Sequence, residues 1–195
     1  MQRGHLFILV APSGAGKRTI IHALKTLLPH LVQVKTLTTR DPRDDEQGPE
    51  AEYRFLSADE FLALREQGGV LESNRYSGNW YGTPKDGVEA VLNQGKLAIL
   101  QIDVHGALAL KSLYPAEVTT VFIASTIEEL EARLNKRGAN TQEEMRERLG
   151  IARQELARQD EFDFVAENHE GRLEDCVQEI YSYISAQYPI DTIVA

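Results

Sequence analysis

The sequence has a single cysteine, Cys176, and fewer basic than acidic residues. A lone cysteine cannot form an internal disulfide, so we expect a protein of the reducing cytoplasm. With 21 Lys and Arg against 30 Asp and Glu, the net charge of −9 argues against a general nucleic-acid-binding protein. No apolar run reaches membrane-spanning length and no signal peptide is recognisable, so we expect no membrane partner. The histidines, His105 included, lack metal-ligand spacing, and we expect no metal held by direct side-chain ligation.

The chain does contain a regular alternation of strand and helix patterns. Its 195 residues suit one sizeable domain. Apolar runs at 6–10, 32–37, 97–102, 118–124 and 162–166 predict strands. Helical patterns between several of them predict an α/β fold, with a parallel core sheet covered on both faces. The span 37–88 is denser in turn signals, including a tight hairpin turn at SGNWYG (77–82), and indicates an inserted substrate subdomain.

Capping patterns predict where the helices begin. Ser57 with Glu60, Ser125 with Glu128, and Thr141 with Glu144 each match the S/T-x-x-E capping box. Thr83-Pro84 predicts a helix with proline at its first position. A helical stripe of Met145, Leu149, Ala152 and Leu156 predicts core packing, and a last helix is expected near 176–184.

Residues 6–19, LFILVAPSGAGKRT, predict a phosphate-binding loop. A buried strand, two glycines, a lysine and an amphipathic helix follow the order of the G-x-x-x-x-G-K-[ST] motif. The glycines let backbone N–H groups point at an anion, and Lys17 and the helix N-terminus add positive charge. Two positions depart from the motif, because Ala11 replaces its first glycine and Arg18 replaces its Ser or Thr. The candidate ATP-binding residues of this loop are Ala11, Pro12, Ser13, Gly14, Ala15, Gly16, Lys17, Arg18 and Thr19.

Six segments of the chain resemble guanylate kinase in order and spacing. They are APSGAGK, TLTTRDPR, SGNWYGT, QIDVHGA, RLNKRG and ENHE, and one extra residue lies between Arg43 and Tyr53. The resemblance covers essentially the whole chain and implies a P-loop three-layer fold with a parallel core sheet (1–36 and 89–195), a GMP-binding insertion (about 37–88) and a short lid (about 136–148). The implied reaction transfers the γ-phosphoryl group of ATP to GMP, giving GDP and ADP, with Mg²⁺ as cofactor. We expect a monomer or a homodimer.

The resemblance also assigns GMP-binding residues whose chemistry suits a guanine monophosphate. They are Thr36, Arg40, Arg43, Tyr53, Glu72, Tyr81, Thr83 and Asp103. The arginines can pair with the phosphate, and Glu72 can accept hydrogen bonds from guanine N1–H and N2–H₂. Asp103 could orient the GMP or a magnesium-bound water. Plain structural roles stay open for each residue: surface ion pairs for the arginines, core packing for the tyrosines, a helix cap for Thr83 and a solvated strand end for Asp103.

The catalytic candidates are cations, because phosphoryl transfer needs positioning and positive charge along the transferred group. They are Lys17, Arg133, Arg137 and Arg148. Arginines on a lid would supply this charge on closure and exclude water. Arg146 is out of register with the family arginines and is expected to be solvated. Asn168, in the ENHE segment, is a candidate contact for the adenine edge of ATP.

Arg18 leaves three functions open, because an arginine cannot ligate the Mg²⁺ that the usual hydroxyl holds. In an active enzyme, ATP phosphates and water would hold the metal and Thr19 would contact the α-phosphate, as in the similar loop of adenylate kinase. A second reading is a catalytically weakened guanylate-kinase-like binding module. A third is a small-molecule phosphokinase such as ribose bisphosphate kinase. The presence of Lys17 and the lid arginines favours the active enzyme, and the guanine-reading set argues against the third function.

Overall fold

The computed structural model describes residues 3–43, 46, 48, 51–136 and 141–188. The chain divides into two compact units. The first unit comprises residues 1–8 and 31–119, and the second comprises residues 9–30 and 120–195. Among the described residues, no helix combines the length and the apolar character that crossing a membrane requires.

The larger of the two sheets is the parallel-strand core that the sequence predicts. Its strands are β1 (His5–Val10), β2 (Val32–Gln33), β7 (Leu97–Gln101), β8 (Val118–Ala124) and β9 (Phe164–Glu167). Their order in the sheet is β2-β7-β1-β8-β9. The pairs β2–β7 and β8–β9 are parallel. All six residues of β1 are buried, as expected for a central strand of a parallel sheet.

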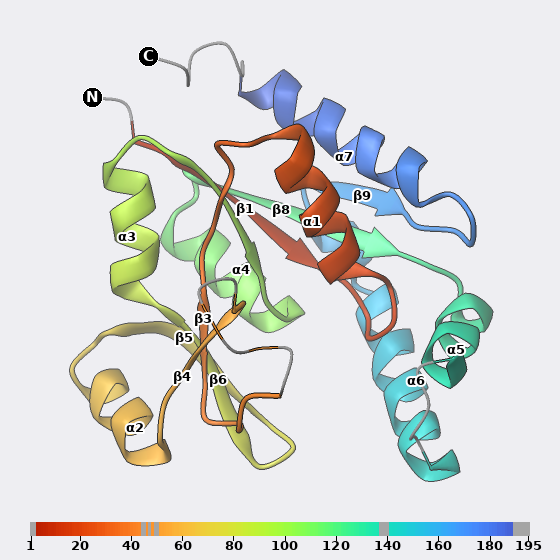
Figure 1. Ribbon diagram of the computed structural model, residues 1–195, viewed down its shortest axis with the longest axis horizontal. Helices are drawn as coiled ribbons and strands as arrows, with labels where there is room; N and C mark the ends of the chain where they lie inside the picture. Colours follow the sequence, from red (N-terminus) through yellow and green to blue (C-terminus); the bar gives the residue numbers. More distant parts are fainter. Residues whose placement is uncertain (1–2, 44–45, 47, 49–50, 137–140, 189–195) are drawn as a thin grey trace. The chain divides into compact units, whose positions relative to one another are not determined.

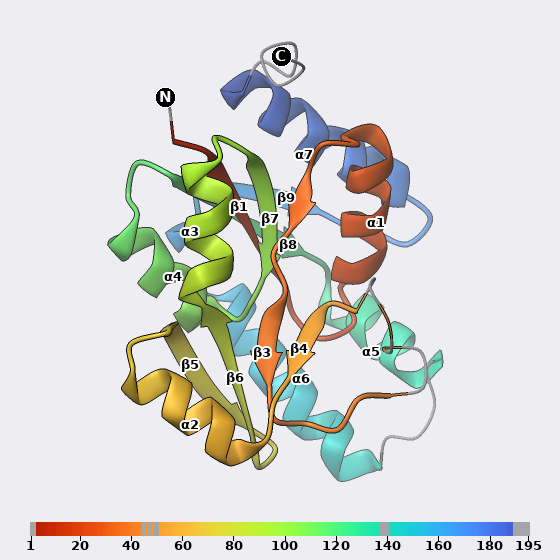
Figure 2. The same cartoon turned by 60° about the vertical axis from the view of Figure 1, so that its left-hand side comes forward.

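The second sheet lies entirely in the first unit. It consists of β3 (Thr36–Thr38), β4 (Tyr53–Phe55), β5 (Val70–Tyr76) and β6 (Asn79–Pro84), in the order β4-β3-β6-β5. Strands β5 and β6 form an antiparallel hairpin, which Figure 2 shows in olive. Its turn is Ser77-Gly78, and both residues have positive φ, the conformation that matches the twist of a two-residue hairpin. The predicted turn at SGNWYG is therefore shorter than expected, because Asn79 onward belongs to β6.

The helices of the first unit are α2 (Ala58–Glu66), α3 (Lys85–Asn93) and α4 (Val104–Leu113). The capping box of Ser57 and Glu60 at α2 is confirmed. The expectation of a proline at the first position of α3 is wrong by one residue, since Pro84 is the N-cap in extended conformation. Helix α4 was not predicted. Asp103 caps it by accepting a hydrogen bond from the Gly106 N–H, so the solvated strand end considered for Asp103 is a helix cap.

The helices of the second unit are α1 (Lys17–Leu27), α5 (Ile127–Lys136), α6 (Gln142–Leu156) and α7 (Leu173–Gln187), with a 3₁₀ turn at Gln159–Glu161. Helix α7 packs beside α1 (Figure 1). The capping box of Thr141 and Glu144 at α6 is confirmed, and the side chains of Met145, Leu149 and Ala152 are buried as predicted.

Two strand predictions and one cap prediction need correction. The expected strand at 32–37 is two strands, β2 and β3, which belong to different sheets. The last strand, expected at 162–166, begins two residues later. Helix α5 is capped by Thr126 with Glu129 in place of Ser125 with Glu128, because the Ser125 hydroxyl donates to the Asn168 carbonyl.

Candidate active site

The predicted phosphate loop of the second unit has the backbone that its sequence requires. Gly14 and Gly16 adopt φ values of 92° and 90°, in the left-handed region where glycine is favoured. Helix α1 starts at Lys17, directly after Gly16. The Lys17 ammonium donates to the carbonyl oxygens of Ala11 and Pro12. The loop is thus closed on itself at the N-terminus of a helix, an arrangement suited to an anion.

Asn168 supports the loop from the end of β9. Its side chain is buried and donates from Nδ2 to the Ala15 carbonyl oxygen at 2.8 Å. A Cβ on Gly16 would lie 2.8 Å from the same Nδ2, so a side chain at that position would push the two apart. The adenine contact predicted for Asn168 stays a prediction, and the structure adds a loop-positioning bond to it.

Arg133, one of the predicted lid arginines, is anchored to the same strand ends. Its guanidinium donates to the Asn168 carbonyl oxygen at 2.7 Å and to the Ser125 hydroxyl at 3.2 Å. It also forms an ion pair with Glu170, whose other oxygen accepts from Lys136. Its side chain is 16% exposed. Arg133 therefore already holds a fixed position beside the residue that positions the phosphate loop.

The segment 167–170 (ENHE) is bound to the start of α5 by charge-assisted hydrogen bonds. Glu129 accepts from the backbone of Thr126 and of Glu170, from the Thr126 hydroxyl, and from His169. Burial would raise the pKa of Glu129, but these bonds bring it down to about 2. His169 also contacts Glu167 at 2.8 Å. The hydrogen bonds with Glu167 and Glu129 raise the pKa of His169, so its charged form is favoured.

Of the other two predicted lid arginines, Arg148 and Arg137, only Arg148 lies among the described residues. Arg148 lies in α6 with a half-buried side chain, and Arg146 is exposed, which confirms the expectation for Arg146. Arg137 lies outside the described residues, so its role stays a prediction.

The first unit brings together three of the predicted GMP-binding residues. The Thr83 hydroxyl donates to Glu72 Oε1 at 2.6 Å, across the β5–β6 hairpin. Thr83 is fully buried, and it does not cap α3. Asp103 lies close enough for its charge to act on Glu72. The Asp103 carboxylate accepts from the Gly106 N–H and, at 2.9 Å, from Asn74 Nδ2.

Glu72 is the most perturbed carboxyl group of this cluster. Burial, and secondly the charge of Asp103, raise its pKa to about 7, while the hydrogen bond from Thr83 opposes the shift. A partly desolvated carboxylate costs free energy unless it is paired. Two N–H donors on one edge of a base would supply that pairing. The arrangement is therefore suited to reading a guanine.

Arg40, one of the two predicted phosphate-binding arginines, is paired with a carboxylate that the sequence analysis missed. Its NH2 group donates to both oxygens of Glu46, at 2.9 and 2.8 Å, and its guanidinium lies over the rings of Tyr53 and Phe55. Burial lowers the pKa of Arg40, and the bonds and charge of Glu46 outweigh this effect and raise it. A carboxylate is the closest side-chain analogue of a phosphate oxygen pair, so Arg40 is held in the geometry for binding an oxyanion.

The remaining predicted GMP-binding residues of this unit are Arg43, Tyr53, Tyr81 and Thr36. Arg43 is 72% exposed and lies 3.9 Å from Glu46. Tyr53 and Tyr81 meet edge to face, with ring centroids 6.3 Å apart. Thr36 is buried in β3.

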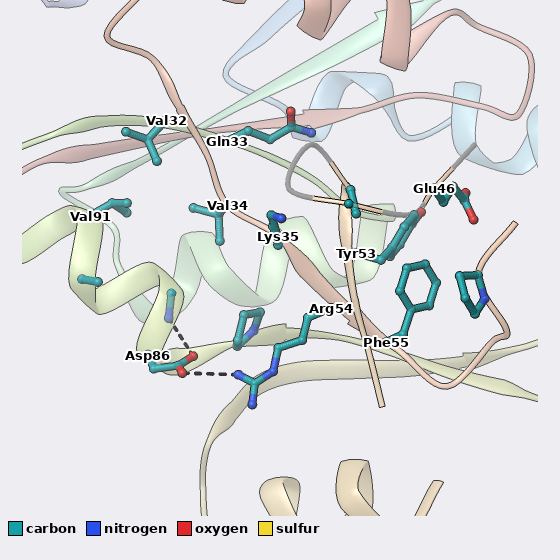
Figure 3. Close-up of a pocket in the computed structure, with 16 residues that line it drawn as sticks. Val32, Gln33, Val34, Lys35, Glu46, Tyr53, Arg54, Phe55, Asp86 and Val91 are labelled. Atoms are coloured by element: carbon teal, nitrogen blue, oxygen red, sulfur yellow. Dashed lines mark hydrogen bonds and ion pairs between the residues drawn. The ribbon is translucent and has the colours of Figure 1, made fainter. Parts of the chain in front are cut away.

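The first unit also has a hollow that Glu72, Thr83 and Asp103 do not line. It has a volume of about 1050 Å³. Figure 3 shows Val32, Val34 and Val91 on one side and Tyr53 and Phe55 on the other, with the Arg54–Asp86 ion pair beside them. Tyr53 lines this hollow, whereas Glu72, Thr83 and Asp103 do not. The chemistry of the predicted residues, and not the size of a pocket, thus locates the candidate site.

Sequence reasoning missed the residues that position the predicted ones. Asn74 shares a strand face with Glu72 two residues away, and Glu46 follows Arg43 by three residues, so both had a detectable spacing. Gly106 follows Asp103 by three residues, and nothing else in the sequence indicated a role for it. The buried strand β1, the glycine loop after it, Lys17 and helix α1 define a P-loop nucleotide-binding protein.

Comparison with known proteins identifies the family. The guanylate kinase family model matches residues 3–187. Guanylate kinase from Synechococcus sp. is 37% identical over 187 residues, which are 96% of this chain and 85% of that relative. The enzyme from Bordetella pertussis is 38% identical over 94% of this chain and 84% of its own length. The crystal structure of guanylate kinase from Anaplasma phagocytophilum superposes with a TM-score of 0.77 at 27% identity, covering 95% of this chain and 87% of that one.

The chain belongs to the guanylate kinase family, as its resemblance implied. It is a kinase that transfers the γ-phosphoryl group of ATP to GMP. Neither the binding module nor the ribose bisphosphate kinase is supported by these matches.

Proposed function

We propose that the second unit binds ATP and the first unit binds GMP, with the residue roles predicted from the sequence. The observation that carries the GMP assignment is the partly buried Glu72 carboxylate, fixed by Thr83 and flanked by Asp103. It offers acceptors to the N1–H and N2–H₂ groups of guanine. Adenine has an acceptor at N1 and no amino group at C2, so it offers the carboxylate no N–H donor at either position. Arg40 and Arg43, with the hydroxyls of Tyr53 and Tyr81, bind the phosphate of GMP.

In the second unit, the loop 11–17 and the N-terminus of α1 hold the ATP phosphates. Lys17 lies at the helix start and supplies a full positive charge to the β- and γ-phosphates. Arg133, Arg137 and Arg148 add charge to the transferred group when the lid, residues 136–148, closes. Asn168 holds the loop through Ala15, and Thr19 contacts the α-phosphate.

We further propose Mg²⁺ as the cofactor, held mainly by ATP phosphates and water. Mg²⁺ prefers oxygen ligands and keeps several waters, which fits a loop whose hydroxyl position carries Arg18. Asp103 suits a water-mediated role, since each carboxylate oxygen accepts one hydrogen bond and keeps lone pairs for another donor. Asp103 would hold a water of the metal, and a bound Mg²⁺ would supply positive charge against the charge that develops during transfer.

Further parts of the proposal concern organisation and setting. The GMP-binding insertion comprises about residues 37–88, a span that includes most of the second sheet. The protein works in the cytoplasm as a monomer or homodimer, with no nucleic-acid or membrane partner. The single cysteine and the net charge of −9 support this setting.

Replacing Lys17 by Ala tests the assignment of the two nucleotides to the two units. The expected result is a fall in kcat of about 10²-fold or more, because a fixed charge on the transferring phosphoryl is lost. GMP affinity, measured by calorimetry without ATP, should stay as in the parent protein. A matching loss of GMP binding would contradict the assignment.

A further inference from the structure

Gly106 faces the carboxylate of Glu72 closely enough to leave no room for a side chain. It is the third residue of α4, and it is buried. A Cβ built on Gly106 would lie 2.8 Å from Glu72 Oε2 and 2.9 Å from Glu72 Cδ. Real carbon atoms do not approach a carboxylate so closely without displacement. The position of the Glu72 carboxylate therefore depends on the absence of a side chain at Gly106.

The backbone of Gly106 does not itself require glycine. Its φ angle is not positive, and it lies in the first turn of a regular helix. Alanine is a better helix former than glycine in such a position. Beyond Glu72, the nearest obstacle to a Cβ is the end of the Ile102 side chain, at 3.2 Å. Glycine is thus needed here for the space that Glu72 occupies.

The same residue contributes to the fixed position of Asp103. Its N–H donates to Asp103 Oδ1 at 2.8 Å, and Asn74 donates to the other oxygen of that carboxylate. Glu72 is held on its opposite side, where Oε1 accepts from Thr83. A side chain at Gly106 would leave these hydrogen bonds of Asp103 possible. It would force Glu72 Oε2 away from α4.

We propose that Gly106 is a specificity-determining positioning residue, which holds open the space where the Glu72 carboxylate is oriented to read guanine. The inference rests on the proposed role of Glu72 in GMP binding. Gly106 touches no part of the reacting phosphoryl group in this account. It acts through Glu72, so a substitution should change base recognition and leave the chemical step largely intact.

Gly106→Ala is the variant that tests this inference, with ADP formation measured against GMP and against IMP, which lacks the 2-amino group. We expect the KM for GMP to rise about 10- to 100-fold, the loss for a displaced charge-assisted hydrogen bond. The kcat at saturating GMP should change far less. The preference in kcat/KM for GMP over IMP should shrink, because a displaced carboxylate no longer accepts from both donors. Gly150→Ala is the matched control, since a Cβ there has nothing within 4 Å in helix α6.

A double-mutant cycle separates this role from a general structural one. Gly106→Ala introduced into a Glu72→Gln background should add little to the KM for GMP, because the guanine-reading group is already lost. Additive effects of the two substitutions would overturn the inference. So would an unchanged GMP KM in Gly106→Ala, or loss of cooperative thermal unfolding, since the strain is assigned to one side chain and not to the fold.

Failure of the inference is distinguishable from failure of the proposed function. If the parent protein shows no GMP-dependent ADP formation, the proposed function fails, and Gly106 loses the role that depends on it. If the parent phosphorylates GMP and Gly106→Ala does so with the same KM, the function stands and the inference is wrong.

Discussion

At the scale of single residues, the surroundings of Glu72 make its ionisation unfavourable in the folded protein. Its carboxyl group is largely buried, has a hydroxyl on one side and the Asp103 carboxylate nearby, and has a pKa raised to about 7. No side-chain cation is among the causes of this shift. No ion pair among the described residues of the folded protein therefore offsets the free energy needed to ionise Glu72. In the proposed function, hydrogen bonds from the N–H donors of guanine offset this free energy.

Glu72→Gln should therefore stabilise the protein at neutral and alkaline pH. Because the folded pKa of about 7 exceeds the ordinary glutamate value of 4.5, the folded state binds the proton more tightly, and ionisation destabilises it as pH rises. The penalty is complete above pH 7 and fades below about 4.5, with an upper size of about 3 kcal/mol. Denaturant unfolding at pH 8 and at pH 5 measures it. A gain in unfolding free energy that is equal at both pH values would contradict this account of Glu72.

Arg18 stands in the phosphate loop where the P-loop motif has Ser or Thr. Its side chain leaves the first turn of α1 beside Lys17 and is exposed. A second fixed cation should strengthen binding of the ATP phosphates and weaken the hold on Mg²⁺. Restoring a hydroxyl with Arg18→Ser should lower the Mg²⁺ concentration for half-maximal rate and raise kcat. Mg²⁺ titrations at saturating ATP and GMP test this, and superimposable curves would show that Arg18 has no effect on the metal.

At the scale of elements, ion pairs and charge-assisted hydrogen bonds join the segment 167–170 to helix α5. His169 lies between Glu167 and Glu129, and Glu170 pairs with Lys136 and Arg133. Since Asn168 in the same segment holds the phosphate loop, these contacts connect the loop to the helix that precedes the proposed lid.

Removing His169 should change the pH dependence of stability. The hydrogen bonds with Glu167 and Glu129 raise its pKa in the folded protein. The stabilisation is therefore complete below about pH 6.5, the unfolded value, and is lost as pH rises through the folded pKa. We expect the difference in Tm between the parent and His169→Gln to be largest at acidic pH and to shrink toward pH 8. His30→Gln, at an exposed histidine, is the control. A Tm difference independent of pH would contradict the role of a charged His169.

The lid should act on the transition state more than on binding. Arg137 lies in the polar stretch between helices α5 and α6. We predict that Arg137→Ala lowers kcat about 10²-fold or more and leaves GMP affinity nearly unchanged, the pattern of a charge engaged on closure. Arg146→Ala, at an exposed position of α6, serves as the matched control. An effect confined to KM would reject the assignment of Arg137.

Local patterns predicted elements whose signal lies in adjacent residues. The strand 118–124 and the capping boxes of α2 and α6 follow from apolar runs and from S/T-x-x-E spacing. At α5 two such patterns are offset by one residue, and a tertiary bond decides between them, because Ser125 is engaged by Asn168. Helix α4 escaped prediction because VHGALALKSL is apolar almost throughout and shows no clear period.

At the scale of the whole molecule, the α/β class followed from the alternation of strands and helices. The sequence could not show that the run 32–37 passes from one sheet to another, since both halves are apolar enough for a strand. The P-loop was predictable because its residues are contiguous. The resemblance placed Glu72, Thr83 and Asp103 in one predicted site. Their contacts with one another and with Gly106 were not predictable, because these depend on how β5, β6 and α4 pack.

The most direct test of the central claim is a coupled assay of ADP formation from ATP and Mg²⁺, with GMP, AMP, UMP or no acceptor. The account predicts rapid ADP formation with GMP and little with AMP, UMP or water, because Glu72 reads the donor edge of guanine and the closed lid excludes hydrolysis. Turnover that does not depend on GMP, or that is equal with AMP or UMP, would contradict it.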